Sequence, residues 1–140
     1  MSSPPVAVPA GIFRRLAAMV YDALLVLALL LTTITLMVVL TNTAVAGRHV
    51  LGLLLVESFA FFTYFWIFRG QTLGMLAWRL VIVSADGYRI TFTQCLLRYL
   101  TAIPSLALLG VGYLALLLDP DRRAWPDRTS DTRILYTPAK

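Results

Sequence analysis

The 140-residue sequence is poor in the side chains that build covalent cross-links and metal sites. Cys95 is the only cysteine, so no disulfide forms within the chain and no cysteine pair is present to bind a metal. His49 is the only histidine, and the usual ligand sets of zinc and haem sites are therefore missing. We expect no metal and no cofactor.

Charge is also scarce. Charged residues make up 14% of the chain, whereas a soluble domain has about 25%. Hydrophobic residues make up 59% and lie in long runs rather than at helical or strand spacing. This composition excludes an ordinary cytosolic domain, a disordered tail and a disulfide-rich secreted module. It predicts an integral membrane protein whose main partner is the lipid bilayer.

The net charge of +5 does not by itself indicate that the protein binds nucleic acid. The arginines flank apolar runs, where basic residues set membrane topology and contact anionic lipid headgroups. The chain also has no serine in a G-x-S-x-G turn, and Cys95 has no histidine nearby in the sequence. We expect a protein that is not an enzyme and has no nucleic-acid partner.

Three apolar runs have about the 20 residues needed to cross about 30 Å of hydrocarbon. They cover residues 16–41, 50–68 and 99–118. The first run is longer than the core of a signal peptide, which has about 7–15 residues, and it contains an aspartate. The expected fold is an all-α membrane protein with a transmembrane hairpin and a third apolar segment. We assign residues 14–137 to this membrane domain and residues 1–13 to a flexible N-terminal segment.

The arginines are unevenly distributed around the spans, and cytoplasmic loops carry the excess of basic residues. Arg14 and Arg15 precede the first span, whereas the link 42–49 has Arg48 alone. Four more arginines follow the second span: Arg69, Arg79, Arg89 and Arg98. We predict a multi-pass protein of the cell inner (cytoplasmic) membrane with its N-terminus in the cytoplasm.

The third run leaves two arrangements open. It crosses the membrane once, which places the tail 119–140 outside, or it bends at Pro104 and returns the tail to the cytoplasmic side. Residues 80–92 have the pattern of a β-hairpin around an Asp-Gly turn, at the membrane interface. Residues 133–137 are also strand-like. Two strands alone are marginally stable in water, and a third strand from the tail favours the return.

Two acids lie inside the predicted spans, where an ionised carboxylate costs at least about 2.5 kcal/mol unless it faces protein or water. Asp22 lies seven residues, nearly two helical turns, after Arg15, so both side chains project from one face. A direct pair between them would be stretched, and water or another arginine is the alternative partner that completes it. Glu57 lies deeper in the second span. The two acids either line a polar path for a proton or cation or hold the helices together.

A glycine-containing segment, Gly70-Gln71-Thr72-Leu73-Gly74, follows the second span directly. It lacks the lysine and the spacing of a phosphate-binding loop. We expect Gly70, Thr72 and Gly74 to shape a structural turn that leads the chain out of the membrane.

Together these segments resemble the RDD family of small membrane proteins, named for one arginine and two aspartates. The matching pieces are Arg15 to Asp22, Gly70 to Gly74, Arg79 to Val83, Asp86-Gly87, Leu97-Arg98, Trp125 to Asp127 and Thr132. The resemblance maps the three naming residues to Arg15, Asp22 and Asp127. Because arginines are expected where Asp127 would lie in the returning arrangement, we predict that it accepts hydrogen bonds from Arg15, Arg79, Arg98 or nearby backbone amides.

The family resemblance implies a membrane role whose activity is poorly defined. Transport of unidentified ligands, cation/proton antiport and assembly of larger membrane complexes have been associated with such proteins. Two hypotheses follow. Either an oligomer moves a small cation or proton past Asp22 and Glu57, or the chain is a non-transport accessory to another membrane protein.

Overall fold

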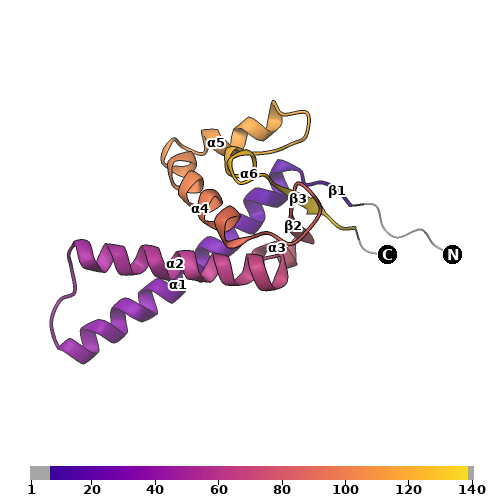
Figure 1. Cartoon of the computed structure of the whole chain (residues 1–140). Helices are drawn as coiled ribbons and strands as arrows, with labels where there is room; N and C mark the ends of the chain where they lie inside the picture. The colour runs from indigo at the N-terminus through magenta and orange to yellow at the C-terminus, as the bar shows by residue number, and fades with distance from the viewer. Residues whose placement is uncertain (1–6, 139–140) are drawn as a thin grey trace.

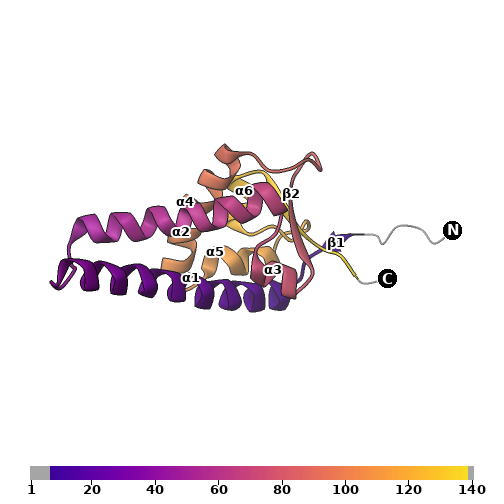
Figure 2. The same ribbon diagram turned by 90° about the horizontal axis from the view of Figure 1, so that it is seen from below.

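Two long apolar helices form the main feature of the structure, a computed structural model that describes residues 7–138. Helices α1 (Ile12–Thr41) and α2 (Arg48–Arg69) lie side by side as a hairpin (Figures 1 and 2). Both are long and apolar enough to cross a membrane, which confirms the first two predicted spans. Asn42, in the left-handed backbone conformation, ends α1 and begins the link to α2.

The third apolar segment is a bent helix pair. Helix α4 (Phe92–Ala107) is followed by α5 (Val111–Leu114) and the 3-10 helix η1 (Ala115–Leu117), and the helix direction bends by 109° between the two arms. Bending was expected at Pro104, but this proline lies inside α4. The chain turns instead at Leu109 and Gly110, whose φ angles are 55° and 79°. Positive φ angles reverse the chain direction, and glycine adopts them without steric cost.

A small antiparallel sheet lies at one end of the hairpin. Its strands are β1 (Val8–Pro9), β2 (Leu80–Ser84) and β3 (Thr132–Tyr136), in the order β1-β3-β2. Strand β2 and the tail strand were predicted. The return strand of the expected hairpin 80–92 is absent, because Thr91 and Gln94 form a capping box that begins α4 at Phe92. Strand β2 pairs with β3 instead.

The position of β3 decides between the two arrangements of the third segment. Because β3 lies between β1 and β2, the chain before α1, the chain after α2 and the tail meet at one end of the hairpin (Figure 1). This is the returning arrangement. Residues 8–9 and 12–13 belong to β1 and α1, which corrects the flexible segment expected over 1–13. Residues 1–6 of that segment and 139–140 of the tail lie outside the described residues.

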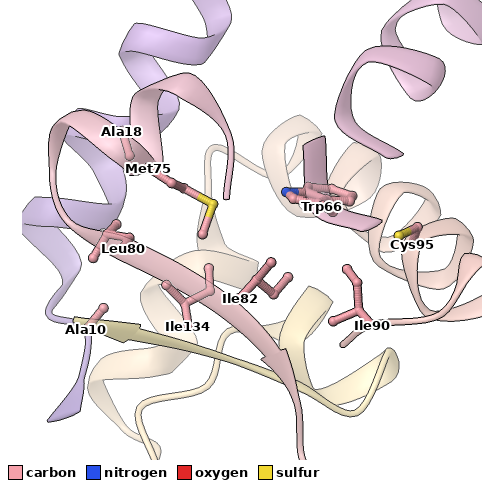
Figure 3. Packing of buried hydrophobic residues seen from close by; sticks show 9 residues of the cluster. All are labelled: Ala10, Ala18, Trp66, Met75, Leu80, Ile82, Ile90, Cys95 and Ile134. Atoms are coloured by element: carbon pink, nitrogen blue, oxygen red, sulfur yellow. The ribbon is translucent and has the colours of Figure 1, made fainter. Parts of the chain in front are cut away.

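The hydrophobic core lies beneath the sheet rather than along the hairpin. Figure 3 shows its nine buried residues: Ala10, Ala18, Trp66, Met75, Leu80, Ile82, Ile90, Cys95 and Ile134. The short helices α3 (Leu73–Ala77) and α6 (Trp125–Thr129) pack against α1 and α4, respectively. By contrast, the most apolar window of α1 contains no buried residue. This apolar part of α1 is suited to contact with lipid, because a helix satisfies its backbone hydrogen bonds internally.

Candidate functional site

Asp127 is the centre of a buried cluster of charges. It is the third residue of α6, and its carboxylate accepts a hydrogen bond from the Ala124 amide at 3.0 Å, which caps the helix. Arg15 of α1 donates from Nη1 to Oδ2, and Arg98 of α4 donates from Nη1 to Oδ1. The Asp127 side chain is fully buried. The predicted hydrogen bonds to Asp127 are therefore present, from two of the three arginines and one amide.

Arg15 joins several chain segments that are distant in sequence. Its Nε donates to the Ala10 carbonyl at 3.2 Å, next to β1, and its Nη2 donates to the Arg122 carbonyl at 2.8 Å. The Ile134 carbonyl of β3 lies 3.5 Å from the same Nη2. These bonds fasten the start of α1 to the returning tail.

Arg98 extends the cluster toward β3 and α2. Its Nη1 also donates to the Thr132 hydroxyl at 3.0 Å, and that hydroxyl lies 2.8 Å from the Ser130 hydroxyl. The guanidinium lies over the Trp66 ring, 5.3 Å from its centroid, within the range of a cation–π interaction. Sequence reasoning did not identify Thr132, Ser130 or Trp66 as partners of Arg98, because none of them lies near it in the chain.

The two arginines keep Asp127 ionised in spite of its burial. Burial alone would raise the pKa of Asp127, but the charges of Arg98 and Arg15 and their hydrogen bonds hold that pKa below its usual value. A carboxylate and two guanidiniums together carry one net positive charge. Such a buried group is strongly destabilised when one partner is removed, because the remaining charge is left uncompensated.

Asp22 forms a second buried contact, and the stretched pair with Arg15 is not formed. The Thr72 hydroxyl donates to Oδ2 of Asp22, and the Gly74 amide donates to Oδ1 at 2.8 Å. Thr72 also accepts from the Met75 amide at 3.2 Å and so caps α3. Side chains on a helix lean toward its N-terminus, so Arg15 extends away from Asp22, which lies seven residues farther along.

The segment expected to form a structural turn thus binds the aspartate. Gly70 ends α2 with a φ of 65°, as expected of a turn. Gly74 has a different role, because a β-carbon built on it would clash with the Ala18 carbonyl and lie 2.9 Å from the Asp22 carboxyl group. Only glycine lets α3 approach α1 this closely. The resemblance to the RDD family could have suggested the contact between Asp22 and this segment, because Asp22 and residues 70–74 are both parts of the family pattern.

Glu57 and Arg79 lie apart from these contacts. Oε1 of Glu57 accepts from the Thr33 hydroxyl of α1 at 2.6 Å, and its buried Oε2 has no hydrogen-bond partner in residues 7–138. Thr33 lies eleven residues beyond Asp22, about 16 Å along α1, so the two acids do not meet. Arg79 is exposed, and its carbonyl accepts from the Thr137 amide and hydroxyl.

A cavity of about 410 Å³ opens between the three apolar segments. Its walls are mostly aliphatic and aromatic, and polar side chains lie along part of its lining. The polar or charged lining residues are Arg15, Asp22, Ser58, Thr72, Arg98, Tyr99 and Tyr113. Glu57 does not line it.

A fourth carboxylate, that of Asp119, supports the start of the tail. Its hydrogen bond from Arg128, at 3.0 Å, and those from the Asp121 and Arg123 amides lower the pKa of Asp119 to about 2. An unfolded aspartate titrates near 3.9. The stabilisation is therefore complete above about pH 4 and is lost as the pH falls toward 2.

We expect acid to destabilise the folded protein in this range, and Asp119→Asn to make the loss of stability shallower. The midpoint of thermal unfolding, measured in detergent from pH 6 to pH 2, checks this. Asp86→Asn is the matched control, because Asp86 is exposed in an Asp-Gly turn that accepts asparagine equally well. Parallel pH profiles for Asp119→Asn and the unmodified protein would contradict the assignment.

The fold and the buried charges define a class: a polytopic helical membrane protein whose arginines and aspartates join the ends of its apolar helices. The family follows from comparison. The RDD family model matches residues 9–131, and the chain belongs to this family. No curated protein and no solved structure matches the chain.

Proposed function

We propose that this RDD protein moves a proton or small cation across the membrane as an oligomer, without covalent chemistry, and that Glu57 binds the ion. The observation that carries the proposal is the buried Oε2 of Glu57, which has no hydrogen-bond partner within residues 7–138. Acids inside spans are costly and commonly mark ion or proton pathways. Asp22 and Asp127 already accept hydrogen bonds from the chain itself, whereas Glu57 retains a binding position.

An oligomer is proposed because residues 7–138 of one chain enclose no path that includes Glu57. Glu57 is absent from the cavity lining, and its partner Thr33 lies about 16 Å from Asp22 along the axis of α1. Beyond the cover of the other helices, the α1–α2 hairpin projects alone (Figure 1). A second copy, or another membrane protein, placed against the hairpin would enclose the side chain of Glu57 between helices.

The test is ion flux into proteoliposomes under an imposed pH or cation gradient. We expect Glu57→Gln to reduce flux at least tenfold, because the amide cannot take up or release a proton or bind a cation by charge. Thr35→Val is the control: Thr35 lies on the same part of α1 but is bonded only to its own helix. Wild-type flux in Glu57→Gln would reject this role for Glu57.

A non-transport accessory role is the alternative, and a specific observation favours it. The two aspartates of the family name, Asp22 and Asp127, are both bound within the chain and act as structural fasteners. A protein that is monomeric in lipid nanodiscs and carries no ion current would fit this alternative. A defined oligomer with flux that depends on Glu57 would fit transport.

We further propose that the sheet end faces the cytoplasm at the cell inner membrane, with its arginines near anionic headgroups. The excess of arginine at this end supports the orientation. Tags fused beside Ser2 and Lys140 are expected to be protected from external protease in intact spheroplasts and cleaved after permeabilisation. Cleavage of either tag in intact spheroplasts would contradict the proposed orientation.

A further inference from the structure

Arg98 retains hydrogen-bonding capacity inside the cavity. Its side chain is only 7% exposed, and Nη1 is occupied by Asp127 and Thr132. Nε and Nη2 donate to no atom of the described part of the chain, and Arg98 lines the cavity. Adjacent guanidinium N–H groups of this kind match a carboxylate or phosphate in two parallel hydrogen bonds.

The charge cluster next to the cavity also attracts an anion. Arg15, Arg98 and Asp127 together carry one net positive charge. Asp22, the acid in the cavity lining, accepts from Thr72 and Gly74 rather than from Arg98. An anion on the open edge of Arg98 would neutralise the cluster.

A second polar group lies in the same cavity. Tyr113 lines it, and its hydroxyl makes none of the hydrogen bonds found within residues 7–138. The hydroxyls of Ser58 and Tyr99, in contrast, are 2.6 Å apart and bond to each other. Tyr113 can therefore donate to an oxygen of the same bound anion.

The rest of the cavity suits a hydrocarbon chain. Its lining includes the aliphatic side chains Val26, Leu27 and Leu30 of α1, and Ile103 and Leu106 of α4. Leu27, Ile103 and Leu106 are about half exposed within the chain, so the cavity opens sideways to the bilayer rather than only to water. A volume of about 410 Å³ is at the small end of the usual range for ligand sites, about 300–1,000 Å³, and suits one chain better than two.

We propose that this cavity binds a single-chain anionic amphiphile from the membrane, beyond any ion movement at Glu57. The carboxylate or phosphate group is bound by Nε and Nη2 of Arg98, and the acyl chain lies along the apolar wall between α1 and α4. The ligand enters laterally. Arg98 thereby connects the bound headgroup to the Asp127 cluster that fastens the tail.

The experiment uses the full chain in lipid nanodiscs and a palmitate analogue that carries a photoreactive diazirine in its chain. Crosslinks mapped by mass spectrometry are expected on the cavity wall, at Leu27, Ile103 or Leu106, and unlabelled palmitate should suppress them. The uncharged hexadecanol analogue should label these positions at least tenfold less. Equal labelling by the alcohol would overturn the proposal, because the charge would then contribute nothing.

Two variants test the site within the protein. Arg98→Lys keeps a positive charge beside Asp127 but removes the adjacent Nε–H and Nη2–H donors of the guanidinium. We therefore expect at least tenfold less labelling at a subsaturating concentration of the probe. Ala102→Phe fills the cavity without changing any charged residue and should have the same effect even if Arg98→Lys does not fold. Leu100→Phe, on the exposed side of α4, is the control. Unchanged labelling in Ala102→Phe would overturn the proposal.

Competitors identify the source of the anion. Lysophosphatidylglycerol, which has one acyl chain, would assign the site to a phospholipid-derived amphiphile if it suppresses the crosslinks as well as palmitate does, whereas its failure to compete would assign the site to a free fatty acid. Either result supports an anionic amphiphile when the labelling depends on Arg98. Suppression by inorganic phosphate at equal concentration would overturn the proposal, since the chain would then add no affinity.

Discussion

Replacing Asp127 by asparagine is expected to lower the free energy of unfolding by about 3–5 kcal/mol, the usual cost of breaking a buried ion pair. Asparagine has nearly the same shape and its oxygen can still accept from the Ala124 amide. The loss therefore reports the charge, because Arg15 and Arg98 would be left buried without a counter-ion. Thermal unfolding of the purified protein in detergent, followed by circular dichroism, measures the change.

The matched control is Asp121→Asn, in the same part of the tail. Asp121 is half exposed and lies 3.2 Å from Arg123, and surface pairs of this kind contribute less than about 1 kcal/mol. Limited proteolysis gives a second readout. Since Arg15 and Arg98 hold the tail through Asp127, the Asp127→Asn protein should be cut in the tail sooner. Equal stability of the two variants would show that Asp127 does not fasten the tail.

Replacing Gly74 by alanine is expected to cost roughly 3 kcal/mol or more, through overpacking and the loss of a buried hydrogen bond to a carboxylate. The added β-carbon would clash with the Ala18 carbonyl of α1 and lie 2.9 Å from the Asp22 carboxyl group. To relieve the clash, α3 must move away from α1, and the Gly74 amide then loses its 2.8 Å bond to Asp22. The unfolding midpoint in detergent measures the effect.

Gly52→Ala is the control for this substitution. Gly52 lies within α2, and a β-carbon added there meets no atom within 4 Å. Alanine favours the helix by about 0.5–1 kcal/mol over glycine, so this variant should be as stable as the unmodified protein or slightly more stable. A Gly74→Ala protein as stable as Gly52→Ala would mean that α3 does not need its close contact with α1.

The spans and the class of protein are properties that could be predicted from the sequence. Residues 16–41 and 50–68 are apolar over the thickness of a bilayer, and in lipid a helix satisfies every backbone group within its own segment. Such helices need no partner for their formation. The link between Asp127 and the arginines was also predictable, because charges at the ends of apolar segments have few other groups with which to pair.

Partners across the chain could not be predicted in the same way. Asp22 was paired with Arg15 by helical spacing, but its oxygens accept from Thr72 and Gly74, about fifty residues away. Strand β2 was paired with the residues after its turn, but it pairs with β3 at the other end of the chain. The bend of the third segment was assigned to Pro104 and lies at Leu109 and Gly110.

The sequence by itself therefore determined that this is a membrane protein of two long helices with buried charges at their polar end. Hydrophobic length and charge position act locally, so they can be read along the chain. Only the tertiary structure decided which groups meet: Asp22 with Thr72 and Gly74, β2 with β3, and Arg98 with both Asp127 and the cavity. Such contacts depend on how separate elements pack together, and the helical or strand periodicity of one segment carries no information about its partner.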